Sequence, residues 1–64
     1  MKLVRFTDPL GGHPEINPDE VVEVRPARPE LGDHPDAKTV IVLENGFQAV
    51  LESEDEVAAK LVSG

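Results

Sequence analysis

The chain has 64 residues, no cysteine and a formal net charge of −7 at pH 7. A chain of this length makes a single domain that buries only about 60% of its unfolded surface, and no disulfide reinforces it. The acidic charge and the presence of only two aromatic residues argue against nucleic acid, which is bound mainly by Lys, Arg and stacked rings.

The first part of the chain predicts a short pair of antiparallel strands. Residues 2–7 alternate in polarity, with Val4 and Phe6 on one side, which is typical of a strand. Proline and glycine in residues 8–12 predict a turn. Residues 13–16 should then return as a second strand at a sheet edge, because a proline there cannot donate a hydrogen bond.

The middle of the chain predicts one helical turn, one strand and a long loop. Residues 17–20 combine a capping Asn with Pro and Glu, which favours a single helical turn. Residues 21–26 alternate in polarity, so we expect Val22 and Val24 to point inward. Residues 26–37 are rich in proline and show no periodicity, so we expect a mobile loop that tolerates shortening.

Residues 38–51 predict a β-hairpin. Asn45 and Gly46 are the pair that most favours a two-residue type I′ turn, which would place Ile41 opposite Val50. Because side chains alternate along a strand, the hairpin has two apolar faces. One face carries Val40, Val42, Phe47, Ala49 and Leu51, and the other carries Ile41, Leu43 and Val50, with Gln48 as its polar member.

The last predicted element is a helix over residues 54–62. Ser53 and Glu56 form a capping box at its start, Glu56 can pair with Lys60, and Gly64 ends it. About nine residues do not hold a helix in water alone, so its apolar stripe must dock on the hairpin. The stripe consists of Val57, Ala58, Leu61 and Val62.

The helix can cover only one face of the hairpin, and we expect it to leave Ile41, Leu43 and Val50 uncovered. Contiguous apolar surface usually marks a partner, so these residues are the candidate interface of a dimer or larger ring. Alternatively, residues 2–6 and 21–25 cross this face and the sheet curls into a small barrel. The expected fold class is α+β, an antiparallel sheet or partly closed barrel of 4–5 short strands with one C-terminal helix.

The sequence shows no pattern typical of catalysis or of cofactor binding. His13 and His34 lie in turns, and they would need Asp33 and Asp36 to converge on them before a metal could bind. Glu52 and the acids after it open a helix and lack the alternating spacing of a calcium loop. We therefore expect no catalytic residue, no cofactor and no metal site.

Two motifs resemble those of the FlbD-type flagellar and swarming-motility proteins, which are very small bacterial proteins. The motifs are T-V-I-V-L-E-N-G at residues 39–46 and E-S-E-D-E-V at residues 52–57, within a likeness that runs over residues 3–61. The resemblance implies short strands, a hairpin and a helix, and a role as an accessory or regulatory factor of motility. The loop at residues 26–37 is longer than the short connection usual in that family.

The preferred interpretation is a non-enzymatic protein-interaction module that associates with itself, with another protein as a further partner. The alternative is a regulator that contacts nucleic acid through Arg5, Arg25 and Lys38 on one side of the sheet. No apolar run approaches the ~20 residues of a membrane helix, and no signal peptide is visible at the start. We therefore expect a cytoplasmic protein without membrane insertion.

Overall fold

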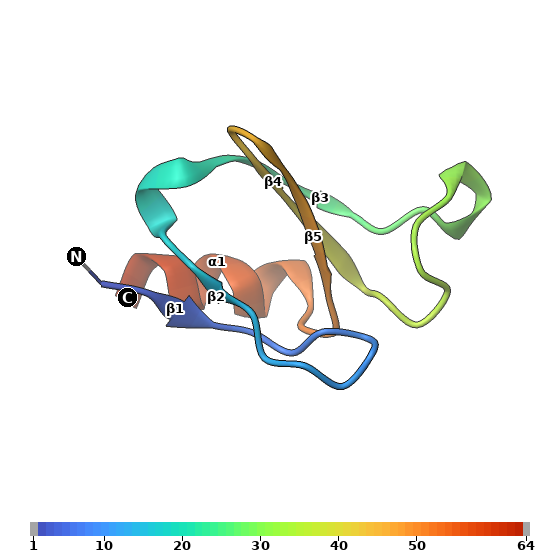
Figure 1. The fold of residues 1–64 in the computed structure, drawn as a ribbon, viewed down its shortest axis with the longest axis horizontal. Helices are drawn as coiled ribbons and strands as arrows, with labels where there is room; N and C mark the ends of the chain where they lie inside the picture. The colour runs from blue at the N-terminus through green and yellow to red at the C-terminus, as the bar shows by residue number, and fades with distance from the viewer. Residues whose placement is uncertain (1, 64) are drawn as a thin grey trace.

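The structure, a computed structural model, describes residues 2–63 and has the predicted α+β class (Figure 1). The strands are β1 (Val4–Arg5), β2 (Glu15–Ile16), β3 (Val21–Pro26), β4 (Thr39–Leu43) and β5 (Gly46–Val50); the 3₁₀ turns are η1 (Pro18–Glu20) and η2 (Pro29–Leu31); the helix is α1 (Glu54–Ser63). β1 pairs with β2, and a separate sheet has the order β3-β4-β5, so no closed barrel forms. Gly64, the predicted helix end, lies outside the described residues.

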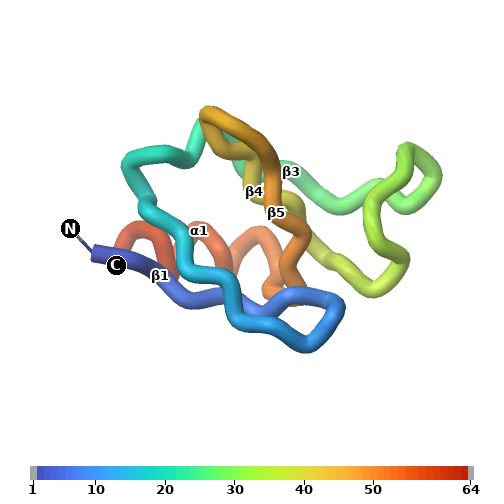
Figure 2. Tube along the Cα trace, viewed as in Figure 1, coloured from blue at the N-terminus to red at the C-terminus, as the bar shows by residue number. Residues whose placement is uncertain are grey.

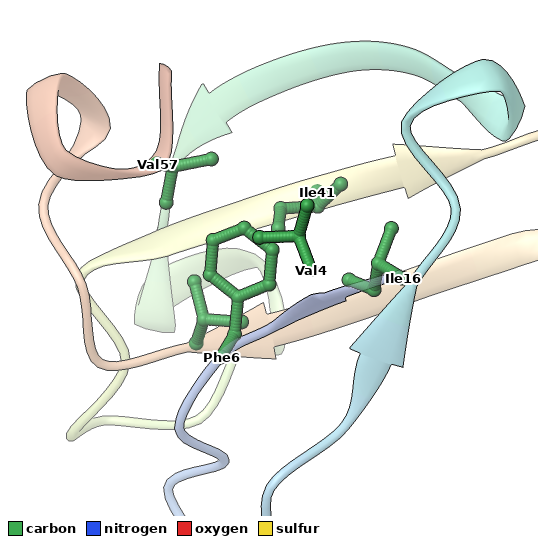
Figure 3. Packing of buried hydrophobic residues seen from close by; sticks show 6 residues of the cluster. Val4, Phe6, Ile16, Ile41 and Val57 are labelled. Carbon is green, nitrogen blue, oxygen red and sulfur yellow. The ribbon is translucent and has the colours of Figure 1, made fainter. Parts of the chain in front are cut away.

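The hydrophobic core lies between β1–β2, α1 and one face of the three-stranded sheet. Figure 3 shows Val4 and Phe6 beside Ile41 of β4, with Val57 reaching in from α1. Phe6 is 1% exposed, and Ile41 and Val57 are fully buried. Burial is worth about 1.5–3 kcal/mol for each large apolar side chain, so this cluster is the main source of stability.

The prediction that Ile41, Leu43 and Val50 form an uncovered surface is wrong. Ile41 and Val50 are fully buried, and Leu43 is half-buried against the same core. Both α1 and the β1–β2 pair cover this face, whereas the sequence pattern assigned α1 to the opposite one. Strands of two residues suffice as a cover because Phe6 adds one large apolar ring to the cluster.

The predicted hairpin forms, but its turn lies one residue earlier than expected. Glu44 and Asn45 are the turn residues. A type I′ turn at Asn45 and Gly46 would require a positive φ at both residues, and neither has one. Ile41 therefore pairs with Gln48, two positions from its predicted partner. Because a shift of two positions preserves alternation, every hairpin side chain keeps its predicted face.

β3 has its predicted bounds, but a bulge changes which residues reach the core. The register shifts between Val21 and Glu23, and Val22 is 64% exposed. Val21 packs against the core together with Val24. An extra residue in one strand interrupts alternation, so the prediction for Val24 is confirmed and the one for Val22 is wrong.

The start of α1 follows the predicted cap. The Ser53 hydroxyl accepts a hydrogen bond from the Glu56 N–H at 3.3 Å. Val57 is fully buried and Leu61 packs against the core, whereas Val62 is 88% exposed. Only the side of the stripe that faces the three-stranded sheet therefore docks, because the short β1–β2 pair does not extend the cover around the helix.

Candidate interaction surface

The three-stranded sheet has a second face, which points away from the core and which we call the outer face. Residues that lie opposite each other in an antiparallel pair share a face. Two rows of paired residues cross this one. The first row is Glu23, Val42 and Phe47, and the second is Arg25, Val40 and Ala49.

Exposure on the outer face increases toward the tip of the hairpin. Val40 is fully buried, Val42 and Ala49 are half-buried, and Phe47 is 70% exposed. Aromatic rings are enriched in protein interfaces because they bury a large area when covered. An exposed ring beside a half-buried valine is therefore the feature of this face best suited to a protein partner.

β5 is an edge of the sheet, and its outer side is open. The Val50 carbonyl accepts a hydrogen bond from the Lys38 N–H at 3.0 Å, so residue 50 directs its backbone groups toward β4. Backbone groups alternate in direction along a strand, so those of Phe47 and Ala49 point to the open side. The strand thus presents, at the same place, an apolar ring and backbone groups that are not bonded to a neighbouring strand.

A buried carboxylate just after β5, which the sequence pattern assigned to the helix start, holds three segments together. Glu52 is 7% exposed, and its two oxygens accept hydrogen bonds from the Thr7 N–H and the Thr7 hydroxyl, both at 3.1 Å. Lys60 Nζ lies 3.4 Å from Glu52 Oε2. The same ammonium donates to the Arg5 carbonyl at 2.8 Å and lies 5.1 Å from the centre of the Phe6 ring.

The charge state of Glu52 follows from these contacts. Burial acts to raise its pKa, but the hydrogen bonds from Thr7 and Lys60 outweigh burial and leave the pKa below its ordinary value. The carboxylate borders an open pocket of about 210 Å³ whose other lining residues are Thr7, Leu51 and Glu56. Both of its oxygens already accept bonds from the protein, so the arrangement fits an anchor between β1 and α1.

A second carboxylate gives order to the loop at residues 27–38, which Figure 2 shows extending beyond the sheets. Asp33 Oδ2 accepts from the Arg28 N–H at 2.7 Å and pairs with the Arg25 guanidinium at 2.8 Å. The hydrogen bond from Arg25 is the largest cause of a lowered Asp33 pKa. These contacts organise the segment, and its tolerance of shortening stays a prediction.

The basic residues considered for nucleic acid come from separate parts of the fold. Arg5 lies on β1, Arg25 on β3, and Lys38 immediately before β4. Asp33 neutralises Arg25 at 2.8 Å, so this guanidinium is not a free cation for a phosphate. Lys38 lies beside the end of β3, where its carbonyl accepts a hydrogen bond from the Ala27 N–H at 3.1 Å, and the use of the three residues for nucleic acid stays a prediction.

The remaining candidate positions have local contacts. His34 Nδ1 accepts a hydrogen bond from the Asp36 N–H at 3.0 Å. Across residues 2–63, no group of three or more His, Asp or Glu side chains is placed to hold a metal ion. Within the same residues, no helix has the length and apolar character needed to cross a membrane.

Comparison with known proteins gives no relative. The chain matches no known family, no curated protein and no solved structure.

Proposed function

We propose that this chain is a small non-enzymatic interaction module that associates with itself through the outer face and the edge of β5. The observation that carries the proposal is the position of Phe47. Its ring is 70% exposed, it pairs with the half-buried Val42, and it lies on a strand with an open edge.

Self-association would supply burial that the chain alone does not achieve. Covering one large apolar side chain is worth about 1.5–3 kcal/mol. A two-fold contact uses the same surface on both copies, so the Phe47 ring of each copy gains contacts with the other copy. Small domains without disulfides or metals commonly gain stability by oligomerising, and this chain has no cysteine.

Charge predicts how association depends on salt. Each copy carries a net charge of −7, so two copies repel each other at low ionic strength. Salt screens that repulsion, and we expect association to strengthen as salt is added. Binding to nucleic acid would weaken under the same change, because salt competes for the phosphates. The sign of the salt effect therefore separates the two functions.

Size-exclusion chromatography with light scattering tests the proposal. We expect a dimer for the parent at high micromolar concentration and a monomer for Phe47→Glu, which places a charge at the centre of the contact. Leu31→Glu is the matched control, because Leu31 is also 70% exposed but lies on η2 in the loop. A monomeric parent, or equal loss of dimer in both variants, would contradict the proposal.

We further propose a role in bacterial motility, as an accessory or regulatory factor that has a second protein as partner. The support is the likeness of residues 39–46 and 52–57 to the FlbD-type proteins. Deletion of the gene should reduce swarming on soft agar, and the parent gene should restore it. Restoration by Leu31→Glu but not by Phe47→Glu would connect motility to the outer face, whereas unchanged swarming after deletion would contradict the role.

A further inference from the structure

The two edges of the three-stranded sheet differ in how they are protected. The β3 edge has a bulge after Val21, the charged residues Glu23 and Arg25, and a terminal Pro26. These are devices by which natural sheets prevent a free edge from pairing with another chain. β5, with the sequence GFQAV, has no charge, no proline and no bulge against β4. The β3 edge is thus protected, and the β5 edge is open over Gly46–Val50, up to Leu51, whose N–H donates to the Thr7 carbonyl at 2.9 Å.

The backbone groups on the open side of β5 have almost no partners. Phe47 and Ala49 direct their N–H and C=O groups to that side. Among residues 2–63, the one bond to these groups comes from the Gln48 side-chain amide, which donates to the Ala49 carbonyl at 2.7 Å. That amide occupies the place a neighbouring strand would take. It can be released when a strand supplies its own N–H.

We infer that two copies of this chain pair β5 against β5, antiparallel, about a two-fold axis at Gln48. The inference rests on the proposed self-association and specifies its geometry. Phe47 of each copy then lies opposite Ala49 of the other, and both residues direct their backbone groups to the shared edge. Each such pair exchanges two N–H···O bonds, so the two three-stranded sheets become one continuous sheet.

The side chains of β5 fit this register. Phe47 has a large ring and Ala49 a single methyl group, so the ring of one copy has room beside the small residue of the other. The two Gln48 side chains meet at the axis, where each amide can both donate to and accept from its equivalent. The strand carries no charge in a chain of net charge −7, so no like charges oppose each other between the paired strands.

Cysteine cross-linking tests the position of the axis. Residues facing each other at a non-hydrogen-bonded position of an antiparallel pair have Cα atoms about 4.5 Å apart, within the range of a disulfide. The chain has no cysteine, so Gln48→Cys introduces a single reporter. Mild oxidation should convert most of this variant into a covalent dimer. Leu10→Cys, at a position 82% exposed in the turn before β2, should stay monomeric under the same conditions.

Ala49→Pro tests the backbone bonds separately. Proline removes one N–H from the open edge of each copy and leaves the bonds between β4 and β5 intact, a placement that edge strands tolerate. Loss of one backbone bond per copy should raise the dissociation constant of the dimer roughly tenfold or more, with an unchanged far-ultraviolet circular dichroism spectrum. If Ala49→Pro fails to fold, the cross-linking of Gln48→Cys alone tests the pairing at β5.

The results of these experiments distinguish pairing at β5 from self-association through another surface. A dimeric parent with no cross-link in Gln48→Cys would overturn the pairing at β5 and leave self-association standing. A cross-link in Leu10→Cys as efficient as in Gln48→Cys would overturn the pairing as well, because the contact would then be unspecific. A parent that is monomeric at high micromolar concentration would overturn both, and the edge would be open to an extended peptide of a different protein.

Discussion

The two phenylalanines of the chain lie in opposite surroundings. Phe6 is 1% exposed and is packed in the core cluster, with the Lys60 ammonium over its ring. Phe47 is 70% exposed on the outer face, next to the half-buried Val42. The inner face of the three-stranded sheet is thus filled by elements of the same chain, whereas the outer face is covered at Val40 and exposed at Phe47. The first ring contributes to folding, and the second is available for association.

Removing each ring in turn should separate these two contributions. Phe6→Ala should lower the free energy of unfolding by about 3–5 kcal/mol, because it leaves a cavity in the core. Phe47→Ala should change it by no more than about 0.5 kcal/mol when the protein is dilute and monomeric. Urea denaturation at low concentration measures both. Phe6→Leu keeps most of the apolar volume and extends the comparison if Phe6→Ala does not fold. Equal losses of unfolding free energy at the two positions would contradict the assignment of Phe6 to folding and Phe47 to association.

The anchor at Glu52 should show the next largest effect. Glu52→Gln keeps the shape but removes the charge that accepts from Thr7 and pairs with Lys60, and we expect a loss of about 1–3 kcal/mol. Glu44→Gln is the control, because Glu44 is exposed in the hairpin turn near the outer face. Chemical denaturation of both variants should show a loss for Glu52→Gln only. A similar loss in the control would mean that overall charge, not the anchor, governs stability.

The same carboxylate predicts how stability depends on pH. The pKa of Glu52 is lower in the folded chain than its ordinary value of 4.5, so the unfolded chain takes up its proton first as the solution is acidified. The contribution of Glu52 is therefore complete above pH 4.5 and is lost as the pH falls through the lower, folded-state pKa. Unfolding free energies measured from neutral pH downward should decline less steeply for Glu52→Gln than for the parent. Parallel curves would show that Glu52 is not a source of acid sensitivity.

The smallest effect concerns the tip of the hairpin. Gly46 has no positive φ, and a methyl group there would meet no atom within 4 Å, so Gly46→Ala should alter the unfolding free energy by at most about 0.5 kcal/mol. Gly32 has a φ of 105°, so Gly32→Ala should cost about 1–2 kcal/mol. Thermal melts of the two variants compare them directly. A large loss of unfolding free energy for Gly46→Ala would instead favour the predicted type I′ turn at Asn45 and Gly46.

Local patterns in the sequence predicted the elements better than their packing. The strand Val21–Pro26, the hairpin, and the helix after its Ser53 cap were all visible, because turn residues and alternation are local signals. The bulge at Val22 and the shift of the turn to Glu44 and Asn45 were not, because tertiary contacts decide between neighbouring registers. The covered face of the hairpin depends on where the distant β1–β2 pair packs, which no local pattern encodes.

The anchor at Glu52 shows why a polar cluster of this kind escapes sequence reasoning. Glu52 stands directly before the helix cap Ser53, where an acid is equally explained by the helix dipole. Its bonds to Thr7 cross a separation of 45 residues. Lys60 follows Glu52 by eight residues and Glu52 precedes α1, so the spacing is not the i, i+4 spacing that predicts an ion pair on a helix. Only the fold brings Thr7 and Lys60 to this carboxylate.

The dependence of the melting temperature on protein concentration tests the central claim most directly, that Phe6 stabilises the fold and Phe47 serves association. Binding to a second folded copy stabilises the native state by mass action. The melting temperature of the parent should therefore rise with concentration, whereas that of Phe47→Ala should stay constant at the value of the dilute parent. A parent melting temperature that does not change with concentration would contradict the account, as would a constant value for Phe47→Ala far below that of the dilute parent.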